Sequence, residues 1–323
     1  MDTSTNNPFF SVCIPTYNTA KFIGEAIESV LQQTFTDFEI VVSDNCSTDT
    51  TEEIVAQFKN DKIRYVKNAH NLGAYPNVSL SIERARGRYV KILCADDKLS
   101  PLCLQVIYEQ LKKHEFKPGG VSVGYTSREQ ELQTLPGYEC KTSLVNKSNF
   151  FDYINSRVKT NLGGFLGSMC ASREIFKDVG YFGIDPNTLT EDIYTWKKIV
   201  LATDCLLIDQ PILYYFRTHE AQGSKALLTI VTLKEDFKFF TENQKLLSSL
   251  SPDSSLEIQK FLDVKVGSFL VAGISSLFRS GSISFLFEVL KTMLQNHYYR
   301  IPITIVIDRC SGKIKQSLAA DAR

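Results

Sequence analysis

The sequence predicts an α/β protein built on a doubly wound sheet that is flanked by helices and followed by a helical C-terminal extension. Two observations support this prediction. Short apolar runs alternate with amphipathic segments from residue 9 to about residue 126, at a spacing that favours parallel strands joined by helical crossovers. Residues 226–300 then read as helical, and "FLDVKVGSFLVAGISSLF" and "ISFLFEVLKTMLQNHYY" are their clearest apolar segments.

Strands and helices are expected to alternate along the first part of the chain. The strands are the apolar runs at 9–15, 37–44, 62–68, 88–93 and 119–126, and the helices between them cover 20–33, 47–58, 77–87 and 101–114. Asp49 and Glu52 have the spacing of a capping box for the second helix. Ser100 and Pro101 suit the N-cap and first turn of the fourth helix.

The alternation of apolar runs with amphipathic segments ends after residue 126. Residues 126–150 are polar and predict a long loop, and the glycine-rich stretch 161–172 is interpreted as a mobile loop. A helix over 190–202 and a strand over 205–219 follow. We therefore expect a disordered tail at 1–8, an α/β domain at 9–225, and a helical region at 226–323.

The composition narrows the class of protein. The chain has 323 residues and a formal net charge of zero, which gives no reason to expect nucleic acid as a partner. No apolar run approaches the roughly 20 residues that span a bilayer, and the polar N-terminus does not resemble a signal peptide. The eight cysteines show no CxxC pairing and mostly stand in apolar contexts. This pattern favours reduced core cysteines and a cytoplasmic protein.

Polar residues follow three of the predicted strands, where ligands bind in doubly wound sheets. They are the segments "PTYN" from Pro15, "DN" at Asp44, and "DD" at Asp96 and Asp97. Two adjacent carboxylates suit Mg²⁺ or Mn²⁺ when a diphosphate supplies further oxygens, or they form a solvated turn that caps the next helix. Asp44 either accepts a hydrogen bond from a base or ribose, or forms an Asx-turn.

Two further segments carry groups that suit catalysis. Glu191 and Asp192 begin a predicted helix, where the helix dipole favours acids. Either residue would serve as a general base if an acceptor hydroxyl reached it. His219 follows the last predicted strand, and it becomes a ligand candidate only if that strand returns to the same sheet edge.

Together these segments resemble family 2 glycosyltransferases with the GT-A fold, over about residues 9–225. The resemblance rests on "SVCIPTYN", "IVVSDNCSTDTTEEI", "NLGAYPN", "GRYVKILCADDKLSP", "GSMCASREIFKDVGYF", "TEDIYTWKKI" and "YYFRTHEAQGS", which occur in the family's order. It implies a GT-A type doubly wound mixed sheet, an inverting sugar transfer from a nucleotide diphospho-sugar, a UDP- or dTDP-linked donor, and a glycan or lipid-linked glycan acceptor. Surface polysaccharide biosynthesis is the implied setting.

The resemblance also assigns roles to positions. It implies that Pro15, Tyr17 and Asp44 line the base, that Asn71 and Asn77 lie over the nucleotide, and that Asp96 holds Mg²⁺ or Mn²⁺ against the diphosphate. It implies that Asp192 is the base with Glu191 its neighbour, and that His219 completes the metal site. Gly167 and Ser168 resemble the loop near the acceptor, and Trp196 is assigned to the same acceptor and donor region.

One departure concerns the metal motif. Cys94 stands where the family's DXD run has an aspartate. In an extended segment, positions 94 and 96 point to one side and position 97 to the other. We therefore expect Asp96 to be the main protein carboxylate on the metal, with Asp97 orienting a side chain or loop and standing as a secondary ligand candidate.

Two alternatives remain open at this point. A nucleotide-sugar-binding partner protein without transfer activity is supported by Cys94 alone, and a Rossmann oxidoreductase lacks the required GxGxxG after the first strand. From Arg300 onward the chain carries five basic and two acidic residues beside "IPITIVI". That composition suggests peripheral contact with the inner face of an anionic membrane.

Overall fold

The computed structural model describes residues 7–157, 165–182, 191–218, 230–280, 284–296 and 298. The chain divides into two compact units. The first comprises Met1–Phe150, Leu162–Asn187 and Glu191–Gln222, and the second comprises Phe151–Asn161, Thr188–Thr190 and Gly223–Arg323. The boundary expected near residue 225 lies outside the described residues, as does His219.

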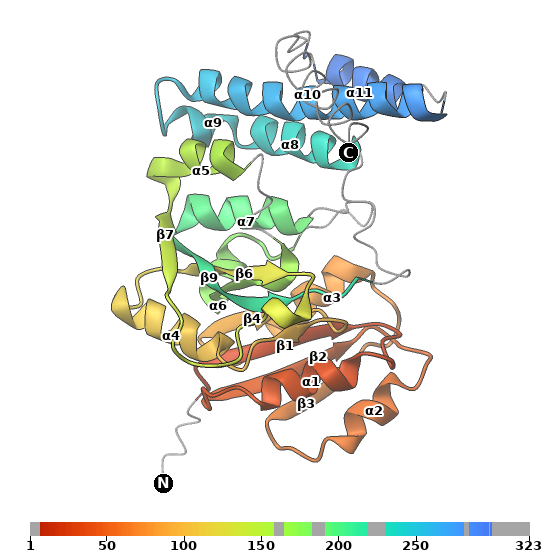
Figure 1. Cartoon of the computed structure of the whole chain (residues 1–323), viewed down its shortest axis with the longest axis vertical. Helices are drawn as coiled ribbons and strands as arrows, with labels where there is room; N and C mark the ends of the chain where they lie inside the picture. Colours follow the sequence, from red (N-terminus) through yellow and green to blue (C-terminus); the bar gives the residue numbers. More distant parts are fainter. Residues whose placement is uncertain are drawn as a thin grey trace, which may run out of the picture. The chain divides into compact units, whose positions relative to one another are not determined.

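The first unit contains a mixed sheet of nine strands in the order β3-β2-β1-β4-β8-β6-β9-β5, with β7 also paired to β9 (Figure 1). The predicted α/β class is confirmed. The strands are β1 (Phe10–Thr16), β2 (Phe38–Asp44), β3 (Ile63–Lys67), β4 (Tyr89–Ile92), β5 (Lys98–Leu99), β6 (Gly120–Thr126), β7 (Lys141–Val145), β8 (Met169–Ser172) and β9 (Cys205–Tyr215). Strands β1 to β4 are mutually parallel where they pair, so their carboxyl ends share one edge.

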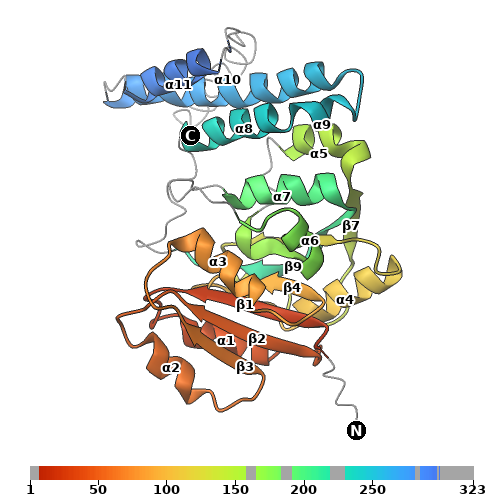
Figure 2. The ribbon, with the colours of Figure 1, turned by 180° about the vertical axis from the view of Figure 1, so that it is seen from behind.

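Helices cover both faces of this sheet. They are α1 (Ile23–Leu31), α2 (Thr51–Gln57), α3 (Ala74–Glu83), α4 (Cys103–Lys113), α6 (Arg173–Asp178) and α7 (Glu191–Ala202). Figure 2 shows α3 in front of β1 and β2, whereas α1 lies behind them. The alternation of side chains along each strand produces this arrangement.

The two faces of β1 illustrate the alternation. Val12 and Ile14 join a buried cluster with Ile27 of α1 and Ile107 of α4. Cys13 points to the other face, where its thiol donates to the carbonyl of Ser81 in α3 at 3.2 Å. The strand is buried on both sides, which explains why its sequence is mostly apolar rather than alternating.

The structure corrects two predicted loops. The segment 126–150 contains the 3-10 helix η1 (Glu129–Glu131), strand β7 and the 3-10 helix η2 (Lys147–Asn149). The described part of 161–172 contains the 3-10 helix η3 (Leu166–Ser168) and strand β8. Strand β8 is antiparallel to both β4 and β6, and long-range pairing rather than local sequence makes it a strand.

Two predicted helix caps are also wrong. Helix α2 has Thr50 at its N-cap without a side-chain cap, and the carboxylate of Asp49, one residue earlier, accepts from the N–H of Thr51 and from that of Ala20, each at 3.0 Å. Helix α4 begins at Cys103 with Leu102 as its N-cap residue. Ser100 still accepts from the N–H of Leu102 at 3.1 Å, in the turn that precedes the helix.

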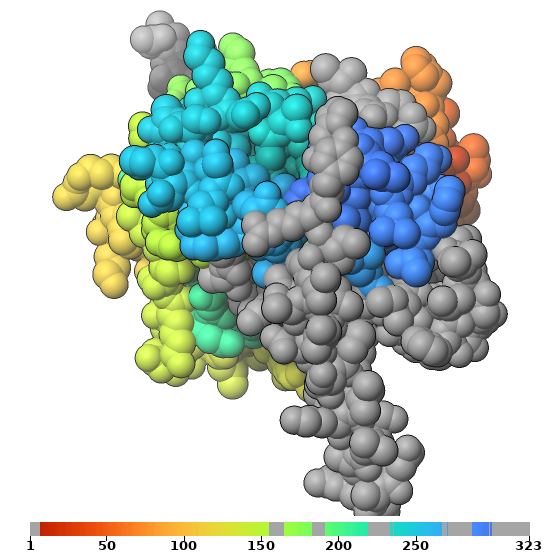
Figure 3. Space-filling model, turned by 90° about the horizontal axis from the view of Figure 1, so that it is seen from above, coloured from red at the N-terminus to blue at the C-terminus, as the bar shows by residue number. Residues whose placement is uncertain are grey.

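The second unit is helical. It contains most of α5 (Phe150–Arg157), together with α8 (Ile230–Glu242), α9 (Gln244–Ser248), α10 (Ser254–Ser280) and α11 (Ser284–Gln295), and the atoms from α8 onward are coloured cyan to blue in Figure 3. Phe240 of α8 packs edge-on against Phe261 of α10 with ring centres 5.3 Å apart. No helix in the described residues combines the length and the apolar character that a membrane span needs. The basic segment from Arg300 onward lies outside the described part of the chain.

Gly87 provides a test of the close packing of the chain before β4 against strand β1. A Cβ at Gly87 would lie 2.5 Å from the backbone nitrogen of Ser11 and 2.6 Å from the backbone carbon of Phe10. Backbone atoms cannot swing aside, so we expect Gly87→Ala to lower the free energy of unfolding by about 1–3 kcal/mol in chemical denaturation.

Gly24 in α1 is the matched control. A Cβ there would meet only side chains, at 3.6 and 4.0 Å. Because alanine favours helix more than glycine, we expect Gly24→Ala to be neutral or to stabilise the protein by up to about 1 kcal/mol. An equal loss of stability in the two variants would contradict the predicted difference.

Candidate active site

The ends of β1 and β2 are joined by hydrogen bonds between the loops that follow them. Asn45 donates its N–H to the carbonyl of Thr16 at 2.9 Å. Asn18, in the left-handed region at φ 52°, donates its N–H to the hydroxyl of Ser47 at 2.9 Å and accepts from the N–H of Thr48 at 2.8 Å. These contacts fix two of the three polar strand ends against each other.

Asp44 is fully buried at the end of β2. One carboxylate oxygen accepts from the N–H and the hydroxyl of Ser47, at 2.8 and 2.6 Å, and the other accepts from the hydroxyl of Tyr65. Asp44 therefore organises its own loop, as the turn alternative expected. Of the other predicted base-lining residues, Pro15 is half-buried and Tyr17 is 46% exposed just beyond the strand.

An asparagine cluster organises the segment that precedes α3. The amide of Asn45 donates to the side chain of Asn71 at 2.7 Å and to the carbonyl of Gly73 at 3.0 Å. Its carbonyl oxygen accepts from the N–H of Leu72 at 2.9 Å. Asn45 thus holds residues 71–73, which we call the donor loop, against the end of β2. The sequence analysis assigned no role to Asn45.

Asn71 is exposed on the donor loop, but Asn77 is not. Asn77 is 3% exposed, and its amide exchanges hydrogen bonds with Ser43, at 2.8 Å to the hydroxyl and 2.9 Å to the carbonyl. It also accepts from Asn68 at 3.0 Å. Asn77 therefore attaches α3 to β2, and the expectation that it lies over the nucleotide stays a prediction.

Cys94, Asp96 and Asp97 lie together beyond the end of β4. One ligand atom from each lies within 4.8 Å of the others. The expectation that Asp97 points away is wrong, because β4 ends at Ile92 and the chain turns, with the N–H of Asp97 donating to the carbonyl of Cys94 at 3.1 Å. The alternation rule applies only to extended backbone.

Asp97 is 2% exposed and has protein partners at both oxygens. It accepts from the hydroxyl of Tyr214 at 2.5 Å and from the N–H of Arg217 at 2.8 Å. Burial, and then the charge of Asp96, raise the pKa of Asp97 to about 7. Asp97 therefore orients a side chain and a loop, as expected, while Asp96 is less buried.

This group of side chains fits a hard divalent cation. Carboxylate oxygens are the ligands that Mg²⁺ and Mn²⁺ prefer, and Asp96 and Asp97 supply them. Burial and the neighbouring carboxylates raise the pKa of the Cys94 thiol well above its usual value, so Cys94 stays protonated and is a poor ligand for these ions. Arg217, whose guanidinium donates to the carbonyl of Asp96 at 3.1 Å and pairs with the carboxylate of Glu25 at 2.8 Å, lies at the same edge.

Asp192 is held by three donors in the first turn of α7. One carboxylate oxygen accepts from the N–H of Leu166 at 3.1 Å, and the other accepts from the N–H of Ile193 at 2.9 Å and from the hydroxyl of Tyr75 at 3.4 Å. Burial is the largest influence and raises the pKa of Asp192 from 3.8 to about 6. A carboxylate with this pKa accepts a proton readily near neutral pH. The adjacent Glu191 is also buried.

The loop η3 connects this carboxylate to the edge that carries Asp96. Lys91, fully buried in β4, donates its ammonium to the carbonyl of Gly167 and, at 2.7 Å, to that of Ile92. The hydroxyl of Ser168 donates to the carbonyl of Phe165 at 2.7 Å. Leu166, in the same loop, reaches Asp192. A lysine inside an apolar strand is the sequence signal that would have identified Lys91.

Trp196 does not belong to this loop. Its side chain is 1% exposed, among the largest of the fully buried residues. It stands on α7, on the same helix as Asp192. Trp196 is therefore a buried residue of α7, and its assignment to the acceptor and donor region stays a prediction.

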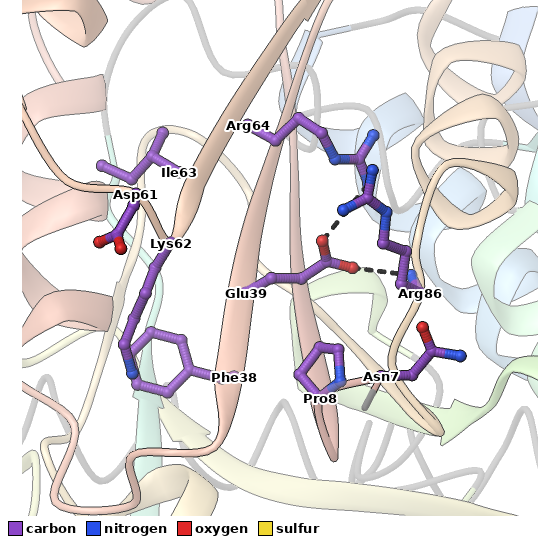
Figure 4. A pocket seen from close by; sticks show the side chains of 9 residues that line it. All are labelled: Asn7, Pro8, Phe38, Glu39, Asp61, Lys62, Ile63, Arg64 and Arg86. Atoms are coloured by element: carbon purple, nitrogen blue, oxygen red, sulfur yellow. Dashed lines mark hydrogen bonds and ion pairs between the residues drawn. The ribbon is translucent and has the colours of Figure 1, made fainter. Parts of the chain in front are cut away.

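A separate hollow of about 790 Å³ lies at the opposite edge of the sheet, where β2 and β3 begin. Figure 4 shows Glu39 between the side chain of Arg64 and the backbone of Arg86, which it contacts at 3.4 and 2.7 Å. This hollow shares no residue with the strand ends described above. It is therefore not the candidate active site.

Comparisons with known proteins agree on one family. The family model described as Glycosyl transferase family 2 matches residues 11–180. An uncharacterized glycosyltransferase of Rickettsia felis is 30% identical over 224 residues, which is 68% of this chain and 36% of the relative. The putative teichuronic acid biosynthesis glycosyltransferase TuaG of Bacillus subtilis is 39% identical over 93 residues, 28% of this chain and 37% of the relative. The matches thus span about a third of each of these relatives.

Solved structures show the same fold. S. aureus TarS 1–349 in complex with UDP-GlcNAc aligns with a TM-score of 0.68 at 18% identity, covering 89% of this chain and 80% of that one. The mannosyltransferase PcManGT from Pyrobaculum calidifontis, in complex with GDP-Man and Mn²⁺, aligns with a TM-score of 0.56 at 16% identity, covering 91% and 88%. The predicted GT-A type fold is confirmed by this likeness.

The pKa of Asp192 predicts how stability depends on pH. Its folded pKa of about 6 exceeds the ordinary pKa of 3.8 that it has in the unfolded chain, so the folded state holds an extra proton between these values. The stability that this proton confers is therefore lost as the pH rises through about 6. We expect Asp192→Asn to gain about 2 kcal/mol of stability relative to the natural chain between pH 4.5 and pH 7.5, measured by denaturant unfolding at each pH. A difference that does not change with pH would contradict this.

Proposed function

The chain belongs to glycosyl transferase family 2, and we propose that it transfers a sugar from a nucleotide diphospho-sugar to an acceptor hydroxyl with inversion of the anomeric carbon. The observation that carries the proposal is the connection made by η3. Its residue Leu166 contacts Asp192, and its residue Gly167 contacts Lys91 on the strand that leads to Asp96. A candidate base and a candidate diphosphate site are thereby held by one short loop.

The proposed reaction is a single displacement. Asp192 accepts the proton of the acceptor hydroxyl while that oxygen forms a bond to the sugar C1, and the bond from C1 to the diphosphate oxygen breaks on the opposite face. The electron pair of the broken bond leaves with the nucleoside diphosphate. A divalent cation, when bound, neutralises charge on that leaving group.

The residues of the chain supply binding and orientation. Asp96 is the principal protein carboxylate for Mg²⁺ or Mn²⁺, and Asp97 fixes the turn through Tyr214 and Arg217. The positive charge of Arg217 favours an anionic leaving group. Alignment of two substrates by such groups supplies part of the roughly 7–11 kcal/mol that orientation offers.

The donor class is proposed from the neighbours. TarS was solved with UDP-GlcNAc, which supports a UDP-linked donor for this chain, and a dTDP-linked sugar is the alternative. The name of TuaG supports a role in the biosynthesis of a surface polysaccharide, with a glycan or lipid-linked glycan as acceptor. We place this reaction in the cytoplasm, where nucleotide sugars are available.

A second candidate function is a nucleotide-sugar-binding partner without transfer activity. Cys94 favours it, because a protonated thiol replaces a carboxylate at the metal edge. Tight donor binding without turnover on any acceptor would support this function. We favour the transferase, because Asp192, Asp96 and Asp97 are all in place.

The principal test is a panel of nucleotide sugars incubated with the purified protein and Mn²⁺, with release of the nucleotide measured. We expect one sugar nucleotide to be hydrolysed slowly, and Asp192→Asn to reduce the rate at least about 100-fold, the lower range for general base catalysis. The rate should rise as the pH passes through about 6, where Asp192 ionises. Asp61→Asn, at the opposite edge of the sheet, is the control and should keep full activity.

The metal assignment has its own test. We expect Asp96→Asn to abolish the Mn²⁺-dependent part of donor affinity in calorimetry, because it removes the principal ligand. Asp97→Asn should change affinity less and should lower thermal stability, because it alters the partner of the buried Tyr214 hydroxyl. An equal loss of Mn²⁺-dependent affinity in both variants, or a loss only in Asp97→Asn, would overturn this assignment.

A further inference from the structure

Tyr75 links two parts of the candidate site that are far apart in sequence. It is the second residue of α3 and follows the donor loop, residues 71–73, which Asn45 holds. Its hydroxyl donates to a carboxylate oxygen of Asp192 at 3.4 Å. The sequence separation of the pair is 117 residues, so only the folded sheet brings them together.

The ring of Tyr75 is fixed independently of this hydrogen bond. It stacks on Phe182 with ring centres 6.0 Å apart and planes within 10° of parallel. Phe182 is in turn attached to α3, because the hydroxyl of Ser79 donates to its carbonyl at 3.1 Å and accepts from its N–H at 3.2 Å. The hydroxyl of Tyr75 therefore has a defined position relative to α3.

Tyr75 acts toward Asp192 as a donor. Burial, and then the charge of Asp192, raise the pKa of Tyr75 far above its usual value, so its hydroxyl keeps its proton. Among the described residues, the titratable groups that face the hydroxyl of Tyr75 are Asp192 and the neighbouring Glu191. The other donors to Asp192 are backbone N–H groups of Leu166 and Ile193, which no side-chain substitution removes.

We infer that Tyr75 is a positioning residue for the base, which orients the Asp192 carboxylate, favours its ionised form, and couples it to the donor loop that Asn45 holds. The inference rests on the proposed function, in which Asp192 takes the proton of the acceptor. It assigns Tyr75 no contact with either substrate. It also implies that a disturbance of the donor loop reaches Asp192 through α3.

Tyr75→Phe tests this inference, because it removes the hydroxyl and keeps the ring that stacks on Phe182. Loss of a donor disfavours the carboxylate form, so the acidic limb of the kcat/KM profile for donor hydrolysis should move to higher pH by about 0.5–1 unit. At pH 6 the rate should therefore fall roughly 2- to 5-fold, with a smaller loss at pH 8.5. The KM for the donor should stay within about 2-fold, since the residue does not bind the nucleotide.

Tyr89→Phe is the matched control. Its hydroxyl is also buried and donates to the carbonyl of Pro118 at 2.9 Å, away from Asp192. It should lower stability without moving the acidic limb. If Tyr75→Phe proves too unstable to assay, the profiles of this variant and of the natural chain are recorded together at a lower temperature, where the same shift must appear.

Coupling to the donor loop is tested by Asn45→Ala. Combined with Tyr75→Phe, it should move the acidic limb no further than Tyr75→Phe alone, because both changes act through one hydrogen bond. An unchanged acidic limb in Tyr75→Phe, or a loss confined to the donor KM, would overturn the inference. Full activity of Asp192→Asn would be a different outcome. It would show that Asp192 is not the base, and it would therefore overturn the proposed function itself.

Discussion

The hydroxyl of Tyr214 occupies a position on which much of the site depends. It donates to Asp97, accepts from the N–H of Cys94 at 3.3 Å, and fills the space where a side chain at position 167 would lie, since a Cβ there would be 1.9 Å from it. The ammonium of Lys91 lies 4.9 Å from the centre of the same ring. One tyrosine at the end of β9 therefore fixes the turn after β4 and requires glycine in η3.

Burial of the charged groups in this arrangement opposes folding, but their contacts fix the geometry of the site in the folded chain. Burial lowers the pKa of Lys91 and raises that of Asp97, so both groups would be better solvated in the unfolded chain. Two carbonyls and a ring face Lys91, and two donors satisfy Asp97. Such networks tolerate only one geometry, because an unsatisfied buried polar group costs about 1–3 kcal/mol. A site that must align a donor, a cation and a base benefits from that restriction.

The sequence analysis found the strand ends but not what connects them. Asp44, Asp96 and Asp192 stand out because acids at the ends of apolar runs or at the start of a helix break a local pattern. Asn45, Lys91 and Tyr75 were missed because each contacts a residue at least 26 positions away. Strands β7 and β8 were missed for the same reason, since their partners determine their conformation.

Local sequence specifies the alternation of β1 to β4 with their helices, the edge at which polar residues gather, and the resemblance to a family. These depend on local periodicity and on the order of short motifs, both of which a chain carries before it folds. The tertiary structure decided that Asp97 turns back toward Cys94, that Asn77 and Trp196 are buried, and that η3 joins Lys91 to Asp192. Those outcomes follow from crossovers and antiparallel pairings between distant segments, whose contacts no local pattern encodes.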